Sequence, residues 1–143
     1  MAEPRHWLMK SEPDVFGWDD LVRDGEGYWD GVRNPTAAMH MRAMKKGDQV
    51  LFYHSNIGLE AVGIMTISGE AEPDRTDKTG RWVAVKVKPV RPLKTPVSLK
   101  AIKAEPRLAD LPMIRQSRLS VVPIDDAQWA VLMEMAQAKK SNR

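Results

Sequence analysis

The sequence contains no cysteine among its 143 residues. This absence excludes disulfide bonds, thiolate nucleophiles and zinc–cysteine sites, and it fits the reducing environment of the cytoplasm. No apolar run approaches the roughly 18 residues that a membrane-spanning helix needs. The N-terminal residues Met-Ala-Glu-Pro-Arg-His also lack the apolar core of a signal peptide. We therefore expect a cytoplasmic protein that does not enter a membrane.

Recognisable catalytic patterns are also missing. The three histidines, His6, His40 and His54, do not lie four residues apart, and none belongs to a metal-ligand pattern. Ser55 follows His54 directly, but neighbours on a strand point to opposite faces and do not easily form a nucleophile–base pair. The nine glycines are scattered and form no phosphate-binding loop. The sequence predicts no catalytic residues, no metal site and no cofactor, so we do not expect an enzyme.

The composition is that of an ordinary folded domain with a mild positive charge. Hydrophobic residues make up 43% and charged residues 29% of the chain, and its length fits one domain spanning residues 1–143. The formal net charge is +3. Eleven of the Lys and Arg residues lie between Lys78 and Arg118, with only Glu105 and Asp110 opposing them. Each cation alone is typical of a solvated face, whereas together they favour a surface that faces phosphates.

Local signals predict several short helices. Residues 18–23 form the first, with acidic residues in its first turn and Gly25 just past its end. Asn34 and Pro35 read as the N-cap and first position of a helix that runs to Met44. Further helices are expected at 97–104, opened by Ser98, and after Asp125, which forms a capping box with Gln128. Residues 139–143 are expected to be a frayed tail.

Alternating apolar residues and turn signals predict strands at 7–10, 48–54, 59–67, 82–90 and 120–122, with 28–33 as a strand or extended loop and 11–14 as a loop. The segments 48–54 and 59–67 read as a β-hairpin across the turn at 55–58. Hairpins with short helices between them indicate the α+β class, as a small barrel or curled sheet with helices packed outside.

Polar and aromatic residues recur at the ends of the predicted strands: Lys10 and Ser11, Trp29, Arg33 and Asn34, Tyr53 to Ser55, and Ser117 and Arg118. Recognition of a nucleobase needs a flat ring for stacking and fixed hydrogen-bonding groups for the base edge. The spacing alone also fits residues that satisfy turns, so both interpretations stay open on this ground.

The same residues carry a resemblance to a known family. Five blocks, in order and properly spaced, resemble those of the EVE domain, which is found in the thymocyte nuclear protein family and in bacterial relatives. The blocks are residues 7–13 (Trp-Leu-Met-Lys-Ser-Glu-Pro), 29–34 (Trp-Asp-Gly-Val-Arg-Asn), 44–55 (Met-Lys-Lys-Gly-Asp-Gln-Val-Leu-Phe-Tyr-His-Ser), 72–74 (Glu-Pro-Asp) and 117–123 (Ser-Arg-Leu-Ser-Val-Val-Pro). Together they cover nearly the whole chain.

The resemblance implies a PUA-like fold, a curled β pseudo-barrel with short flanking helices. It also implies a non-enzymatic domain that holds a modified base of DNA, or of RNA, in an aromatic-walled pocket, with methylated or oxidised cytosine as the leading candidate. By this resemblance Trp29 is the stacking wall, and Lys10 and Ser11 contact the base edge. Tyr53, His54 and Ser55 line the rim, and Ser117 and Arg118 hold the base or a phosphate. Asn34 serves either as a ligand contact or as a helix cap.

One segment departs from the family pattern. Many relatives carry Gln, Arg and Asn within five residues of the Gly-Val-Arg-Asn block, where this chain has Pro35-Thr36-Ala37-Ala38-Met39. The choice of ligand is therefore open. Two other functions also stay open: RNA binding in the PUA manner through the basic stretch from Lys86 to Arg118, and processing of a free nucleoside. For the latter, Glu12 and Asp30 are the only candidates for a carboxylate pair.

Overall fold

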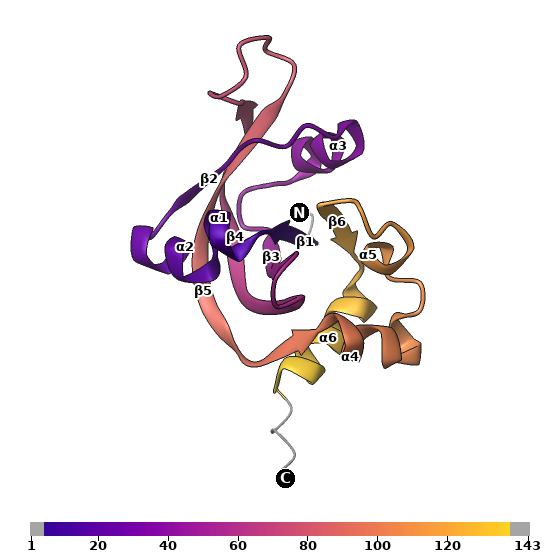
Figure 1. The fold of residues 1–143 in the computed structure, drawn as a ribbon. Coiled ribbons are helices and arrows are strands. Elements are labelled where there is room, and N and C mark those ends of the chain that lie inside the picture. The colour runs from indigo at the N-terminus through magenta and orange to yellow at the C-terminus, as the bar shows by residue number, and fades with distance from the viewer. Residues whose placement is uncertain (1–4, 138–143) are drawn as a thin grey trace.

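The computed structural model describes residues 5–137, and within them one mixed sheet has the strand order β2-β5-β4-β3-β1-β6. Its strands are β1 (His6–Ser11), β2 (Gly27–Trp29), β3 (Gln49–His54), β4 (Glu60–Pro73), β5 (Val83–Ser98) and β6 (Val121–Ile124). β1 and β3 are parallel, and every other neighbouring pair is antiparallel. The long strands β4 and β5 bend around the centre of the molecule (Figure 1), and their pairing shifts register at several bulges, which allow such a bend. The α+β class and the curled sheet are confirmed.

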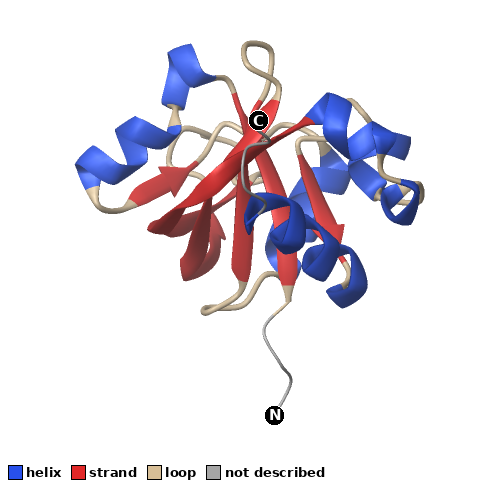
Figure 2. Ribbon diagram, turned by 90° about the horizontal axis from the view of Figure 1, so that it is seen from below, coloured by secondary structure: helices blue, strands red, loops and turns tan. Residues whose placement is uncertain are grey.

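Short helices surround this sheet (Figure 2). They are α1 (Pro13–Phe16), α2 (Trp18–Asp24), α3 (Pro35–Ala43), α4 (Leu99–Ala104), the 3₁₀ turn η1 (Pro106–Leu108), α5 (Pro112–Arg115) and α6 (Asp126–Gln137). The capping box of α6 is confirmed, because the Gln128 amide donates to Asp125 Oδ1 at 2.6 Å and the Asp125 amide donates to Gln128 Oε1 at 3.2 Å. The predicted tail at 139–143 lies outside the described residues.

Four segments differ from the sequence predictions. Strand β4 does not end at Ile67 but continues to Pro73. Residues 13–16, expected to be a loop, form α1, with Pro13 at its first position. Strand β5 does not end near Val90 but continues to Ser98 through Pro92 and Pro96, where its pairing with β4 is irregular. Val97 accordingly belongs to β5, opposite Ala61, and the helix that Ser98 caps begins at Leu99.

Aromatic rings gather around Phe52 of β3. The ring centroids of Phe16, Trp18, Trp29 and His54 lie 5.5–6.3 Å from that of Phe52. Three of these four contacts are edge-on, the geometry that aromatic quadrupoles favour. This cluster joins α1 and α2 to the ends of β2 and β3 and thereby fixes the positions of these segments.

Candidate functional site

A cavity of about 630 Å³ opens where the ends of β1, β2 and β3 meet α1, the β2–α3 loop and the α5–β6 loop. Its volume lies within the usual range for small-molecule sites. We call it the main cavity; it is lined by Lys10, Ser11, Glu12, Val15, Phe16, Tyr28, Trp29, Asp30, Gly31, Val32, Arg33, Ser55, Ser117, Arg118 and Ser120.

Aromatic side chains form part of its wall. Phe16, Tyr28 and Trp29 all line the cavity. Trp29 is fixed by edge contacts with Phe16 at 6.1 Å and with Phe52 at 5.5 Å between ring centroids. Only 8% of Trp29 is exposed, so a complete ring-on-ring stack on this residue requires a neighbouring wall residue to move aside.

Hydrogen bonds from β1 hold the surrounding loops. Lys10 Nζ donates to the Ser117 carbonyl at 2.8 Å, and the Lys10 amide donates to the Ser120 carbonyl at 2.9 Å, which ties β1 to the α5–β6 loop. Burial lowers the pKa of the Lys10 ammonium. Ser11 Oγ donates to the Phe16 carbonyl at 2.7 Å, and the Ser11 carbonyl accepts from the Ser55 amide at 2.9 Å. The end of β1 therefore positions three of the surrounding segments.

Charged groups of both signs face the cavity. Lys10, Arg33 and Arg118 supply donors, and the carboxylates of Glu12 and Asp30 supply acceptors. Asp30 and Arg118 are exposed, and among residues 5–137 neither side chain forms a hydrogen bond or ion pair. These two groups are thus available to a ligand without breaking an internal contact.

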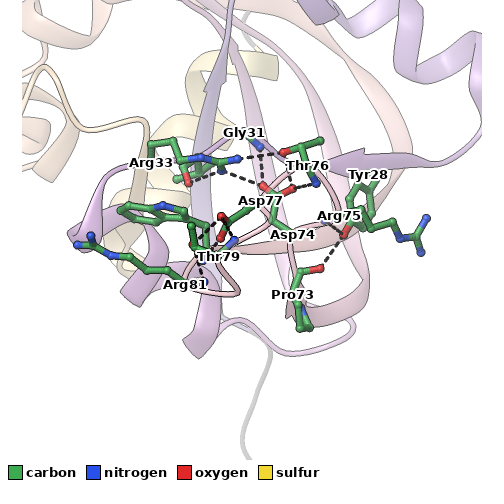
Figure 3. Close-up of polar contacts among 12 residues, drawn as sticks. Tyr28, Gly31, Arg33, Pro73, Asp74, Arg75, Thr76, Asp77, Thr79 and Arg81 are labelled. Atoms are coloured by element: carbon green, nitrogen blue, oxygen red, sulfur yellow. Dashed lines mark hydrogen bonds and ion pairs between the residues drawn. The ribbon is translucent and has the colours of Figure 1, made fainter.

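The β2–α3 loop is held in place by Asp74, at the end of β4 (Figure 3). Its carboxylate is fully buried and accepts hydrogen bonds from the Gly31 amide at 2.8 Å, Arg33 Nη1 at 3.0 Å, and the amide and hydroxyl of Thr76 at 2.7 and 2.6 Å. Burial alone raises the pKa of Asp74, but the donors from Thr76, Gly31 and Arg33 outweigh it and hold the pKa well below its usual value. A buried, ionised carboxylate therefore fixes one wall of the main cavity.

A second carboxylate shapes the β4–β5 loop itself. Asp77 accepts from the amide and hydroxyl of Thr79 at 2.9 and 2.6 Å and from the Trp82 amide at 2.8 Å. These bonds, led by the one from the Thr79 hydroxyl, lower the pKa of Asp77 to about 2. The loop is thus a fixed turn, and it packs against the wall of the cavity through Arg33 and Asp74 (Figure 3).

The structure brings six of the nine predicted site residues together at the main cavity: Lys10, Ser11, Trp29, Ser55, Ser117 and Arg118. Three residues lie elsewhere. Tyr53 lines a neighbouring cavity of about 200 Å³, and burial raises the pKa of its hydroxyl to about 12. His54 Nε2 accepts from the Trp18 amide at 3.1 Å, and burial lowers the pKa of this imidazole.

Asn34 caps α3, because its Oδ1 accepts from the Ala37 amide at 3.0 Å. It also lines a small cavity of about 250 Å³ together with Thr36, Gln116 and Arg118. The structure shows the capping role and places the residue beside the main cavity rather than in it.

The role of Asn34 as a helix cap can be tested by substitution. We expect Asn34→Ala to lower the free energy of unfolding by about 1 kcal/mol, because the Ala37 amide loses its partner. Asn34→Ser restores a capping oxygen and should restore that stability in urea unfolding. If the serine variant is as unstable as the alanine variant, the cap does not account for the role of Asn34.

Sequence reasoning missed several residues of the site. Phe16 and Tyr28 line the cavity, but nothing in their spacing distinguishes them from core aromatics. Asp74 lies in the Glu-Pro-Asp block, so a signal was present, yet its partners Gly31 and Arg33 are more than 40 residues away in the chain. Only the fold reveals that contact.

Within residues 5–137 no three His, Asp or Glu side chains are grouped so that they could hold a metal ion. The helices of the same part of the chain are all too short or too polar to cross a membrane.

The model of the EVE domain family matches residues 5–135. The chain belongs to the EVE domain family. Thymocyte nuclear protein 1 of Rattus norvegicus is 31% identical over 170 aligned positions, which cover 95% of this chain and 75% of the rat protein. The predicted membership is therefore confirmed.

Solved structures of three other proteins have the same fold. An NMR structure of a Rhodopseudomonas palustris protein is 50% identical, with a TM-score of 0.88 and 92% of each chain covered. A crystal structure of human THYN1 in complex with DNA containing 5-methylcytosine is 29% identical, with a TM-score of 0.87 and coverage of 95% of this chain and 99% of that one. The YTH domain of Zygosaccharomyces rouxii MRB1 shares the fold at a TM-score of 0.58 and 17% identity. The PUA-like architecture predicted for this EVE domain is thus confirmed.

Proposed function

We propose that this EVE domain binds a modified cytosine of DNA, 5-methylcytosine or an oxidised form of it, in the main cavity and catalyses no reaction on the base. One observation carries the proposal: human THYN1, whose fold matches over nearly the whole chain, forms a complex with DNA containing 5-methylcytosine. The cytoplasmic location expected from composition stays a prediction.

The base enters the cavity by leaving the duplex. Extrusion costs a few kcal/mol of unstacking, which contacts inside the cavity must offset. Stacking on an aromatic ring supplies about 1–3 kcal/mol per base. Trp29 provides that ring, and Phe16 and Tyr28 line the same cavity.

The charged groups of the wall match the edge of cytosine. Cytosine presents one amino donor, which a carboxylate recognises, beside two acceptors that need donors. Asp30 and Glu12 supply carboxylate acceptors, and Lys10 and Arg118 supply donors. In our proposal Asp30 accepts from the amino group, since its carboxylate is otherwise unoccupied among residues 5–137.

The methyl group of the base is recognised through contacts with apolar side chains. Val15, Phe16 and Val32 are the apolar residues of the wall beside Trp29. One methyl group in an apolar site discriminates by about 1–3 kcal/mol. In the segment that departs from the family pattern, Ala37 and Ala38 are buried, so neither side chain reaches a ligand. In our proposal the preference among modifications rests on the residues of the main cavity and on Thr36, which lines the neighbouring small cavity with Arg118.

The test is a titration of the protein with duplexes that carry a single cytosine, 5-methylcytosine or 5-hydroxymethylcytosine at one position. We expect tighter binding of a modified duplex than of the unmodified one. Trp29→Ala should weaken binding of the preferred duplex about tenfold or more, because the stacking surface is removed.

Trp29→Phe is the matched control for that substitution. It retains an aromatic ring beside Phe52 and should retain most of the affinity. If Trp29→Ala leaves binding of every modified duplex unchanged, the base does not stack on Trp29. Circular dichroism of both variants separates weakened binding from disrupted folding.

One observation favours a second function, the processing of a free nucleoside. Glu12 and Asp30 line the same cavity, so the only predicted carboxylate pair does reach one site. Paired carboxylates are a common acid–base arrangement. Incubation with 5-methyl-2′-deoxycytidine and chromatography of the mixture decide between the two functions. A new product would overturn the binding-only proposal, and an unchanged nucleoside supports it.

A further inference from the structure

We infer that four exposed cations around the β4–β5 loop bind the phosphodiester backbone of DNA next to the extruded base. We call them the hairpin patch: Arg42 of α3, and Arg75, Lys78 and Arg81 of the loop. The inference rests on the proposed function, since the base in the main cavity is what brings the backbone to this loop.

The loop turns its negative charge inward and its positive charge outward. The carboxylate of Asp74 is fully buried, and that of Asp77 is occupied by Thr79 and Trp82. Lys78 and Arg81 stay exposed, and among residues 5–137 no carboxylate pairs with either of them. Arg75 is partly neutralised by Glu72 at 3.6 Å. Arg42 likewise pairs with no carboxylate among the described residues, so Arg42, Lys78 and Arg81 carry most of the free charge.

The patch is held in a defined shape. The guanidinium of Arg81 lies over the Trp82 ring at 4.6 Å, and that of Arg33 lies 5.9 Å from the same ring. Arg42 Nη2 donates to the Arg81 carbonyl at 3.0 Å, which joins α3 to the loop. Cations that are already positioned lose less conformational freedom when they contact a ligand.

The patch is continuous with the main cavity. Tyr28 and Arg33 line that cavity and also contact the loop (Figure 3). The Tyr28 hydroxyl donates to the Pro73 carbonyl at 3.0 Å and accepts from the Arg75 amide at 3.2 Å, while the Arg75 guanidinium lies over the Tyr28 ring at 4.5 Å. A backbone that delivers a base to the cavity therefore passes beside the patch.

Other cations of the basic stretch do not share this position. Arg107 is engaged by Glu105 and Glu134, and Arg115 is engaged by Asp110. Lys100 lies on α4, at the opposite end of β5 from the loop (Figure 1). Of the predicted basic stretch, Lys78 and Arg81 belong to the patch and Arg118 lines the main cavity.

The experiment compares two double variants. The patch variant is Lys78→Gln/Arg81→Gln. The control variant, Lys94→Gln/Lys100→Gln, removes the same charge from exposed positions on β5 and α4. Each protein is titrated with a duplex containing one 5-methylcytosine, with the unmodified duplex and with RNA of the same sequence, at several salt concentrations. The patch variant should weaken binding of both duplexes equally, by about tenfold, and reduce the salt slope by about one for each phosphate that it no longer neutralises. The control variant should match the wild type.

The outcomes separate this inference from the proposed function. If the patch variant keeps wild-type affinity and salt slope, the hairpin patch does not bind the backbone, while the ratio between modified and unmodified duplexes still tests the cavity. A weakening confined to RNA overturns the assignment to DNA. If the wild-type protein binds no duplex at all, both ideas fail. Unchanged thermal unfolding midpoints show that the exposed substitutions leave the fold intact.

Discussion

Asp74→Asn is expected to lower the free energy of unfolding by about 3 kcal/mol, because charge-assisted hydrogen bonds to a fully buried carboxylate are lost and its donors keep no equivalent acceptor. The buried carboxylate accepts four hydrogen bonds, including one from Arg33. An amide offers one acceptor oxygen and turns an N–H₂ group toward other donors. Because Gly31 and Arg33 line the main cavity, DNA binding should weaken as well. Urea unfolding and the duplex titration measure the two effects.

Asp110→Asn is the matched control for this substitution. It makes the same chemical change in the exposed ion pair with Arg115, where the Asp110 side chain is 81% exposed. Ion pairs on the surface contribute about 0–1 kcal/mol to the free energy of unfolding, so Asp110→Asn should change the stability little. An Asp74→Asn protein as stable as the Asp110→Asn protein would show that Asp74 does not brace the loop.

The contribution of Asp74 to the free energy of unfolding should depend on pH. Its pKa is lowered in the folded protein, so the stabilisation is present above the unfolded pKa, near 4, and is lost as the pH falls through the folded value. The difference in unfolding free energy between wild type and Asp74→Asn should therefore be constant at pH 5–7. It should shrink progressively below about pH 4.

Local chemistry made some parts of this fold predictable. The caps at Asn34 and Asp125 depend on residues three positions away in the chain, so the sequence shows both partners. The path of β5 through Pro92 and Pro96 depends instead on bulges in its pairing with β4. No local pattern shows whether a neighbouring strand tolerates a missing N–H, and the strand was therefore predicted too short.

The sequence likewise predicted some residues of the candidate site and not others. Lys10 and Ser55 reach one cavity because β1 and β3 are parallel neighbours whose ends meet at one edge of the sheet. Trp29 lines the same cavity from β2, which runs antiparallel to both strands, so its place there depends on the curling of the sheet. Side-chain direction at the end of β3 was not predictable, since the pairing with β4 shifts between Phe52 and Tyr53. Alternation along the strand therefore does not reveal which face Tyr53 and His54 present. The structure places them in a neighbouring cavity and against Trp18.

Gly63→Ala should destabilise the protein by about 3 kcal/mol, at the upper end of the range for overpacking a core. A Cβ at position 63 of β4 would lie 2.5–2.6 Å from three carbons of the Trp18 ring. That ring has little room to retreat, because it is 7% exposed and its centroid packs 5.6 Å from that of Phe52. Phe52 also contacts Trp29, so the displacement should pass to the wall of the main cavity. Urea unfolding followed by tryptophan fluorescence reports both the stability and the altered surroundings of Trp18 and Trp29.

Two comparisons identify Trp18 as the cause of that clash. Gly69→Ala makes the same change in the same strand but meets only the Cβ, Cδ and Cγ of Lys86 at 3.1–3.3 Å. These contacts need a much smaller shift than the clash with the Trp18 ring, so the cost should stay below about 1 kcal/mol. In a Trp18→Phe background the smaller ring leaves space for the new methyl group, and Gly63→Ala should cost much less than in the wild type. A cost that is equal in both backgrounds would give a coupling energy near zero and exclude Trp18 as the obstacle. A reduced cost would show that the absence of a side chain at position 63 is what lets Trp18 support Phe52 and, through it, the cavity wall at Trp29.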